Sequence, residues 1–411
     1  MTRLTRWLNA TVITLVAYPT IASAQSLTWL PQPWGSSARA WDVSDDGCVV
    51  VGDLLPRGSL GRGFWWSRQQ GLHVFGTPGI REGYAYAVSA DGRVAVGVEY
   101  ETYQIAYAYR WTLENGVQRL GDFGSPYSYA SDVSGDGRVI VGFAHLPLSA
   151  LLVGFRWTVA DGIQRVSPLY RWPGAHAVNR AGTIISGILE SPEGGYWAIC
   201  WLEEGAQRIF GYSLPPRVNG SLGTLITSED GQIIVMQNAR ESQLPRIYWW
   251  EVGSSPLDIG DLGGGMSLGG VRGDGAIIVA EAFSGNERRA VRWVNGHGLK
   301  DLNDAYAHLL GDGSSLLRAA SVSVDGRYIV GTGWNGSVGR QRAFLLDTWR
   351  YGDTNGDGAL DDCDLLNVLL AFGTPGTGYT RHKDINKDGE VDDADLLTIL
   401  FEFGGGPCEG D

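Results

Sequence analysis

Short apolar runs alternate with turn residues along most of the chain, and the same pattern recurs many times. In residues 87–97, one apolar run ends at Val88, a second begins at Val94, and Asp91-Gly92 lies between them. Asp-Gly between two apolar runs is the strongest local signal for a tight hairpin turn, because glycine tolerates a positive φ angle. The pattern therefore predicts short β-strands joined by tight turns.

The turn dipeptide recurs roughly every 45 residues, which marks an internal repeat. Each repeat divides into four strands: an Ala-x-x-Val-Ser segment, an apolar run after the turn, a segment ending in Trp, and a short strand after a further turn. Four short strands per repeat are typical of a propeller blade. We therefore predict a mainly β fold, a seven-bladed β-propeller. Its turns are Asp46-Gly47, Asp91-Gly92, Asp136-Gly137, Ala181-Gly182, Asp230-Gly231, Asp274-Gly275 and Asp325-Gly326.

The two ends of the repeat region complement each other. The seventh repeat runs through residues 343–346 and stops before a fourth strand, whereas residues 26–30 precede the first repeat with nothing to pair with. Leu30 precedes Ala40 by the offset that separates the last strand of one repeat from the first strand of the next. We therefore predict that the N-terminal strand completes the last blade and closes the ring without an open edge strand.

The charge is concentrated in the tail. The formal net charge is −13, and residues 353–411 hold eleven Asp and three Glu against one Arg and two Lys. The tail therefore carries −11 and the remaining residues only −2. This balance argues against a nucleic-acid partner for either part.

Residues 1–24 have the pattern of a secretory signal peptide. Arg3 and Arg6 precede a short apolar run, and Ala22-Ser23-Ala24 supplies the small residues of a cleavage site. The run is too short to span a bilayer, and no later segment is apolar enough to do so. We therefore expect an extracellular protein, secreted or attached to the cell surface.

The Val-Ser-x-Asp-Gly core of the repeat, with the Arg-Trp that follows it in Arg110-Trp111 and Arg156-Trp157, resembles the extracellular HAF repeats. The resemblance covers about residues 26–347. It implies a propeller-like fold in secreted proteins and no established chemistry. Residues present in every repeat are expected to be scaffold, with Asp91 and its equivalents forming the turns and Trp111 and its equivalents packing between blades.

Residues that break the repeat are better candidates for a binding site. Tyrosines gather in the second and third repeats, and their flat faces with polar tips suit sugar rings or protein partners. Because tyrosine also favours strands, ordinary sheet composition is the alternative interpretation. The candidate ligand cluster is Tyr100, Tyr103, Tyr107, Tyr109, Tyr127 and Tyr129.

Catalysis has weaker support, and the catalytic residues are unknown. Glycoside hydrolysis needs two carboxylates at a defined separation, and the pattern does not single out a pair. The histidines show no metal-ligand spacing, and no nucleophile motif is present. An enzyme would be a glycoside hydrolase or polysaccharide lyase with acids drawn from Glu99, Glu101, Glu190, Glu241 and Glu281.

Two stretches of the tail, residues 353–364 and 384–395, place oxygen-bearing side chains at positions one, three, five, nine and twelve, with glycine at six. This is the ligand spacing of an EF-hand calcium loop, in which the carbonyl at position seven also binds the ion. The sequence therefore predicts two calcium ions. The ligands are Asp353, Asn355, Asp357, Ala359, Asp361 and Asp364 in the first loop, and Asp384, Asn386, Asp388, Glu390, Asp392 and Asp395 in the second.

Each loop leads into a short apolar helix that ends at Gly373 or Gly404. A duplicated loop with an exiting helix resembles a type I dockerin over about residues 352–408. The resemblance implies a cohesin-like partner, and because positions ten and eleven depart from the Ser-Thr pair of cellulosomal dockerins, a different cohesin or a stand-alone calcium-stabilised tail stays open. The implied partner-binding residues are Asp362, Cys363, Asp393 and Ala394.

The cysteines suit an oxidising compartment. Cys363 and Cys408 both lie in the tail, where a disulfide would attach the C-terminus to the module. Cys48 and Cys200 lie in the first and fourth repeats, so the ring geometry is expected to hold them apart.

These features divide the chain into a signal peptide (residues 1–24), a propeller (25–347) and a small all-α dockerin-like domain that binds calcium (348–411). Three functional hypotheses follow. The first is a non-catalytic binding or surface-display propeller with a calcium-dependent attachment module. The second is a carbohydrate-active enzyme of polysaccharide catabolism, delivered by its dockerin. The third is a structural cell-surface repeat protein.

Overall fold

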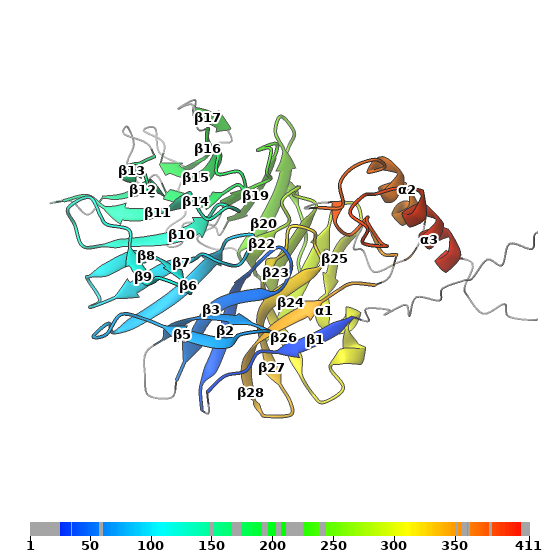
Figure 1. Ribbon diagram of the computed structural model, residues 1–411, viewed down its shortest axis with the longest axis horizontal. Helices are drawn as coiled ribbons and strands as arrows, with labels where there is room; N and C mark the ends of the chain where they lie inside the picture. Colours follow the sequence, from blue (N-terminus) through cyan, green and yellow to red (C-terminus); the bar gives the residue numbers. More distant parts are fainter. Residues whose placement is uncertain are drawn as a thin grey trace, which may run out of the picture.

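Among the residues that the structure describes, seven four-stranded antiparallel sheets form a ring around a central channel, with a small helical tail at one end of the ring (Figure 1). The structure is a computed structural model. It describes residues 25–33, 35–56, 61–147, 151–166, 174–190, 196–202, 207–210, 225–238, 244–350, 352–354, 360, 362–377 and 380–403.

The strands follow the repeat in chain order. The first three sheets contain β2 (Ser37–Val43), β3 (Val49–Leu55), β4 (Arg62–Ser67) and β5 (Gly71–Phe75); β6 (Glu82–Val88), β7 (Ala95–Tyr100), β8 (Ala106–Thr112) and β9 (Gly116–Arg119); and β10 (Ser128–Val133), β11 (Ile140–His145), β12 (Leu152–Thr158) and β13 (Gly162–Arg165).

The next three sheets contain β14 (Gly174–Val178), β15 (Ile184–Glu190), β16 (Tyr196–Leu202) and β17 (Gln207–Phe210); β18 (Leu225–Thr227), β19 (Ile233–Asn238), β20 (Arg246–Glu251) and β21 (Leu257–Asp258); and β22 (Met266–Val271), β23 (Ile277–Ser284), β24 (Glu287–Val294) and β25 (Gly298–Asp301). The last sheet contains β26 (Ser315–Val322), β27 (Tyr328–Asn335), β28 (Arg340–Asp347) and β1 (Ser26–Trp29).

A serine and an aspartate hold each regular turn. In the second sheet, Ser89 Oγ donates to Asp91 Oδ1 at 2.7 Å and accepts a hydrogen bond from the Val94 amide at 3.0 Å. The same arrangement recurs in four other sheets, at Ser44, Ser134, Ser228 and Ser323. The predicted scaffold role of the Asp-Gly turns is confirmed.

The turn glycines join neighbouring blades. Gly92 has a φ of 75°, and a Cβ there would lie 2.5 Å from the Val49 side chain of the preceding blade. At Gly47 a Cβ would overlap the ring of Tyr328, which belongs to the last blade. Each turn therefore packs directly on the blade before it, and the first blade packs on the last in the same way.

The repeated tryptophans pack between blades, as predicted. Trp65 Nε1 donates to the Gly92 carbonyl of the next blade at 2.7 Å, and the Trp65 and Trp111 rings lie 5.9 Å apart between centroids. Trp249 repeats both contacts with Gly275 and Trp293, at 2.9 Å and 5.9 Å. A large ring and one directed hydrogen bond thus link each of these blade pairs.

A second spacing that recurs in the repeats places glycine opposite a β-bulge. The pairing of β6 with β7 shifts register between Ala85 and Ala87, and this bulge turns the Tyr84 carbonyl toward Gly97. A Cβ on Gly97 would overlap that oxygen. The same clash would occur in three other sheets, at Gly52, Gly142 and Gly331.

Gly97→Ala is therefore expected to lower the free energy of unfolding by about 2–3 kcal/mol, because the bulged strand must move away from the new methyl group. Gly83→Ala in the same sheet is the matched control, since its Cβ would approach other atoms no closer than 3.5 Å. Chemical denaturation of both variants measures the difference. Equal stability of the two variants would contradict the bulge packing.

The N-terminal strand lies at the outer edge of the last sheet. β1 pairs antiparallel with β28, with Ser26 opposite Asp347 and Trp29 opposite Phe344. Leu30 continues the contact, since its amide donates to the Ala343 carbonyl at 3.0 Å and its side chain is 1% exposed. The two ends of the propeller chain are therefore joined in one sheet.

The predicted fold class nevertheless needs correction, because the blades are not alike and the tail is not all-α. The fifth sheet is reduced, with three residues in β18 and two in β21. Two short helices, α1 (Leu302–Ala305) and η1 (Ala307–Leu309), interrupt the connection to the last sheet. In the tail, α2 (Asp362–Leu370) and α3 (Asp393–Phe403) accompany an antiparallel bridge between Pro375 and Glu390. A regular seven-bladed propeller with an all-α module is therefore wrong as a description.

The tail has a small core of its own. Five buried side chains from the two helices and the segments between them form one cluster: Val368, Ala371, Ile385, Val391 and Ile399. The link to the propeller is short and packed, because Trp349 is 7% exposed and the Arg327 guanidinium lies 5.3 Å from its ring centroid.

Candidate functional site

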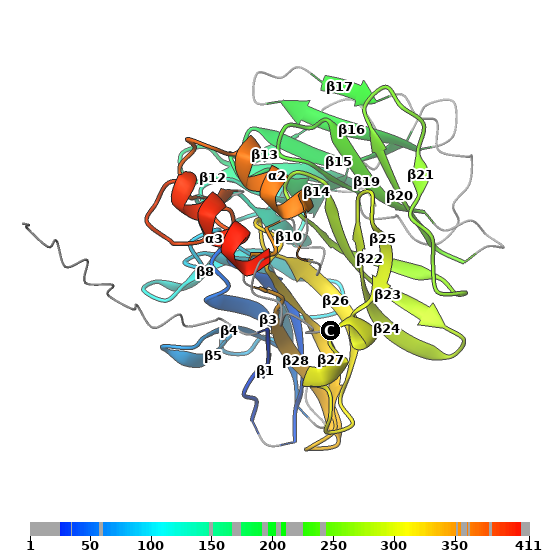
Figure 2. The same ribbon diagram turned by 90° about the vertical axis from the view of Figure 1, so that its right-hand side faces the viewer.

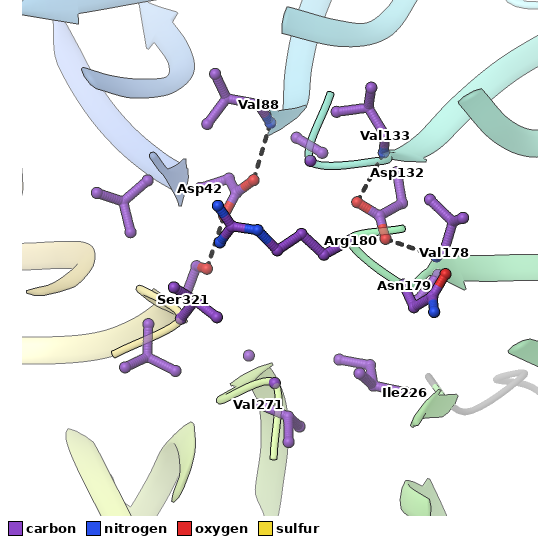
Figure 3. A pocket seen from close by; sticks show the side chains of 18 of the residues that line it. Asp42, Val88, Asp132, Val133, Val178, Asn179, Arg180, Ile226, Val271 and Ser321 are labelled. Carbon is purple, nitrogen blue, oxygen red and sulfur yellow. Dashed lines mark hydrogen bonds between the residues drawn. The ribbon is translucent and has the colours of Figure 1, made fainter. Parts of the chain in front are cut away.

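The inner strands of the ring enclose a channel with a cavity of about 310 Å³ (Figure 3). Its lining changes character along the axis. Trp41, Tyr86 and His176 stand at one level, Asp42 and Asp132 follow them on the bulged inner strands, and the level next to the turns carries charged side chains.

Asp42 connects three blades. Its Oδ2 accepts a hydrogen bond from the Val88 amide of the next blade at 2.8 Å, and its Oδ1 accepts one from Ser321 Oγ of the last blade at 2.7 Å. Burial raises the pKa of Asp42 to about 6, although these hydrogen bonds favour the ionised form.

Asp132 occupies the equivalent position two blades away. Its two oxygens accept hydrogen bonds from the Val178 amide of the next blade and from its own Val133 amide, both at 2.8 Å. Burial raises the pKa of Asp132 to about 8, and the charges of Asp42 and Glu229 add to that increase. A neutral carboxyl is therefore favoured near physiological pH.

Charges of both signs meet at the turn end of the channel. The Arg180 side chain extends across the channel and forms an ion pair with Asp45, while Glu229 accepts the Arg180 amide at 2.7 Å (Figure 3). At the aromatic level, burial lowers the pKa of His176 to about 4, so its ring is neutral at physiological pH. The channel therefore has two different ends. Trp41, Tyr86 and His176 form the aromatic collar at one end, and charged side chains line the turn end.

The structure separates the predicted tyrosine cluster into three environments. Tyr109 is 1% exposed and donates to the Tyr84 carbonyl at 2.9 Å, so it belongs to the core. Tyr103 and Tyr107 lie apart, each with an arginine guanidinium 3.6 Å from its ring centroid.

The other three tyrosines belong to a continuous row of rings. Most neighbouring rings in the row have centroids 4.5 to 6.2 Å apart. Tyr100 and Tyr127 are linked by a hydrogen bond between their side chains. Sequence reasoning missed Tyr84 and Tyr86, although their alternation along one strand was a visible signal. This aromatic row is Trp41, Tyr86, Tyr84, Tyr100, Tyr127, Tyr129, Phe143, His145 and His176.

Two of the candidate acids stabilise the fold. Glu99 is 1% exposed and accepts hydrogen bonds from the amide and the hydroxyl of Thr77. Glu281 is 5% exposed and pairs with Arg288. Glu101 lies exposed in a turn, and Glu190 lies at the end of β15. Glu241 is outside the described residues.

The described part of the tail includes the whole second loop. Asp395 is fully buried and its Oδ1 accepts hydrogen bonds from the amides of Ile385 and Asn386, at 2.7 and 3.0 Å. Asp384 accepts the Asp388 and Gly389 amides at 3.1 and 3.0 Å. Position six of the loop, Gly389, has a φ of 105°. The first and last acids of the loop therefore organise its backbone.

The donor chemistry of this loop fits calcium, since its side chains offer only hard oxygens. Burial and the Asp395 charge raise the pKa of Asp384, despite hydrogen bonds that oppose the shift, so the two carboxylates repel each other. Within the described residues, however, no three His, Cys, Asp or Glu side chains are grouped closely enough to hold a metal ion. Glu390 and Asp392 lie in the loop, and Glu390 is exposed.

The first loop is described only at its ends. Asp364 is buried and accepts a hydrogen bond from the Thr354 amide at 2.7 Å, as Asp395 does in the second loop. Asp353 is also buried. The other predicted ligands lie outside the described residues: Asn355, Asp357, Ala359 and Asp361.

The helices of the tail expose an apolar face. Asp362, Cys363 and Asp393 are exposed at the helix starts, and Ala394 is half-buried. Leucines follow on the next turns, and equivalent positions of the two helices match in exposure. The exposed fractions are 53% for Leu366, 49% for Leu369, 78% for Leu370, 50% for Leu397 and 49% for Leu400.

The predicted disulfide is untested, because Cys408 lies outside the described residues. Cys363 is exposed at the start of α2, and Cys48 is an exposed free thiol beside the first turn. Residue Cys200 lies in β16 of the fourth sheet, three sheets along the ring from Cys48.

Comparisons with known proteins add no family. No protein-family model matches the sequence, and no curated protein matches it. Three solved structures are similar: TolB from Acinetobacter baumannii (11% identity, TM-score 0.42, 78% of this chain and 66% of that chain), the β-propeller domain of the Trilobed protease from Pyrococcus furiosus (11%, 0.49, 76% and 96%), and a prolyl endopeptidase (12%, 0.49, 79% and 50%).

This chain spans just under two thirds of the TolB chain and half of the prolyl endopeptidase chain. At these identities and TM-scores, the similarities carry no argument about activity, substrate or partner. The propeller fold rests on the connectivity of the sheets themselves. None of the helices in the described part of the chain has the length and apolarity needed to cross a membrane.

Proposed function

We propose that this chain is a secreted, non-catalytic binding or surface-display propeller, whose tail is a calcium-dependent attachment module for a cohesin-like partner. The main support is the apolar face of the tail helices. Leu366 and Leu397 are about half exposed at equivalent positions, one turn after the exposed Asp362 and Asp393. A paired apolar face rimmed by polar residues is typical of a protein interaction site.

Calcium would be held by the oxygen donors of the two loops. In the second loop these are Asp384, Asn386, Asp388, Asp392, Asp395 and the Glu390 carbonyl, and the equivalent donors of the first loop would hold a second ion. When bound, the ion supplies the positive charge that offsets carboxylate repulsion. Asp395 and Asp364 join each loop to the first turn of its helix, so order in the loop supports the helix that carries the apolar face.

The channel favours binding over catalysis. Both carboxylates at its middle level accept main-chain hydrogen bonds from the neighbouring blade, which is the role of a structural clamp. The aromatic row around the other end offers flat apolar faces with hydroxyl tips, which suit a glycan ligand. The propeller would therefore display or bind, while the tail attaches.

A recombinant type I cohesin domain is expected to bind the full-length protein in calcium and not in chelator. Leu397→Lys should weaken that binding at least tenfold, because it places a charge in the apolar face. Ile385→Val in the tail core is the matched control and should leave affinity unchanged. Surface plasmon resonance measures binding, and isothermal titration with calcium measures a stoichiometry of two.

The outcomes separate the parts of the proposal. Absence of calcium binding would contradict the loop assignment and the dockerin resemblance together. Calcium binding without cohesin binding would leave a calcium-stabilised tail that serves another partner. Release of reducing sugar from a polysaccharide, lost in Asp42→Asn or Asp132→Asn, would favour the enzyme instead.

A further inference from the structure

The tail covers the turn end of the channel. A cavity of about 470 Å³ at this end is lined both by blade turns, including Asp46, Asp91 and Asp136, and by Gly376, Thr377 and Arg381 of the tail. It shares Arg180 and other lining residues with the channel cavity. Figure 2 shows the tail in front of this end of the ring. The described tail residues concerned, 374–377 and 380–383, are named the cap.

The contact between the tail and the turns also brings opposite charges together. The blade turns end on this face, and six of the seven carry an aspartate, whereas the fourth has Ala181. Arg381 is the single arginine among residues 353–411, a segment of net charge −11. Its guanidinium is close enough to lower the pKa of Asp46, together with hydrogen bonds from Ser44 and the Cys48 amide that outweigh the effect of burial. The single arginine of an acidic tail thus faces the aspartates of the turns.

The residues after Arg381 extend the contact to the sixth sheet. His382 is 7% exposed and lies close to Arg272 of the sixth sheet. Lys383 lies near Asp274 in the turn of the same sheet. Since Arg381 faces the turns of the first and last sheets, the cap contacts three consecutive sheets of the ring, and the cavity beneath it extends to the turns of the second, third and fourth sheets.

The cap is held firmly within the tail. Its Thr374 carbonyl accepts the Val391 amide at 2.9 Å, and the Gly376 amide donates to the Gly389 carbonyl at 2.8 Å. Gly376 lies so close to Asp384 that a Cβ would overlap that side chain. The apolar faces of α2 and α3 stay exposed with the cap in place.

We propose that the ring of Asp-Gly turns is a docking surface for the cap, and that Arg381 anchors the cap there and closes this end of the channel. A ligand then reaches the channel only from the aromatic collar. The exposed helix faces remain free to bind a partner at the same time. This inference goes beyond the proposed function and does not depend on a cohesin partner.

Channel access tests the proposal. Ala90 lines both cavities, so Ala90→Cys places a thiol behind the cap. In the full chain, a maleimide carrying a polyethylene glycol chain is expected to label residue 90 slowly. Arg381→Glu should raise the labelling rate at least tenfold, because it replaces attraction to the turns with repulsion. Peptide mapping quantifies labelling at residue 90 separately from the native cysteines.

Two further variants keep the test decisive. Arg165→Glu reverses the charge of an exposed arginine in β13, the outer strand of the third sheet, and should leave the rate unchanged, whereas Arg381→Lys should stay close to the parent rate. Circular dichroism must show the same melting for each variant. Equal labelling of the parent and Arg381→Glu would overturn the proposal. Calcium binding by Arg381→Glu is measured in a separate titration. Loss of calcium binding in this variant would count against the loop assignment and not against the docking of the cap.

Discussion

Deletion of residues 25–30 is expected to lower the melting temperature of the propeller by roughly 5–10 °C and to promote association. The deletion removes β1 from the edge of the last sheet and uncovers β28. It also removes Leu30, which is 1% exposed, and the Trp29 ring, which lies edge-on to Phe344 at 6.2 Å. Loss of one large buried side chain costs about 2–5 kcal/mol, and an open strand edge favours pairing between molecules.

Calorimetry and light scattering of the deleted protein measure the two effects. Leu30→Ala should reproduce part of the loss of stability without association, because the strand and its main-chain bonds remain. Thr28→Ala is the control on the same strand. Thr28 is half-buried, and its hydroxyl accepts an exposed hydrogen bond from the Arg68 guanidinium. A deleted protein that melts like the parent would show that β1 does not stabilise the ring.

Much of the ring could be predicted because its interactions are local or periodic. The Ser-x-Asp-Gly turn is decided within a few residues, and Trp65 and Trp249 contact the next blade 27 and 26 residues further along the chain. The irregular parts could not be predicted in this way. The fifth repeat has Thr227-Ser228-Glu229 in place of the common core, and its shortened strands depend on the neighbouring sheets.

The sequence contains a signal for the two channel carboxyls, because both break the repeat at the same position. Asp42 and Asp132 occupy the same position of the repeat, where the second and fourth repeats have Ala87 and Ala177. A charged residue at a position that alternation directs inward indicates either a clamp or a site. Composition and periodicity could not show which of the two it is, because the partners, such as Ser321, are distant in sequence.

The contact between the tail and the blade turns could not be predicted from the sequence. A net charge of −11 predicts repulsion between the tail and the acidic turns. The contact depends instead on the placement of Arg381 and on burial of His382, and both follow from the tertiary fold. The predicted calcium ligands, in contrast, follow a local spacing, so the sequence predicts them residue by residue, and they stay a prediction.

The stability of the propeller is expected to fall as the pH rises from 5 to 8.5, because of the channel carboxyls. The pKa of Asp132 is about 8 in the folded chain and 3.8 as the reference value, so folding favours the protonated group. Its stabilising contribution is complete below pH 4 and is lost as the pH rises through 8. Asp42, with a pKa of about 6, loses its contribution earlier in the same range.

Asp132→Asn should remove most of this pH dependence. At pH 5 we expect the variant to be about 1 kcal/mol less stable than the parent, because the amide nitrogen cannot accept the Val133 hydrogen bond. At pH 8.5 the variant should be more stable than the parent by ~2 kcal/mol, since the variant buries no charge. Urea unfolding at both pH values measures the change. Asp136→Asn is the control: the pKa of Asp136 is lowered, mainly by hydrogen bonds from Ser134 and the Arg138 amide that outweigh burial, so its cost should be equal at both pH values. A parallel loss in the two variants would place the Asp132 carboxylate in an environment that stabilises its charge.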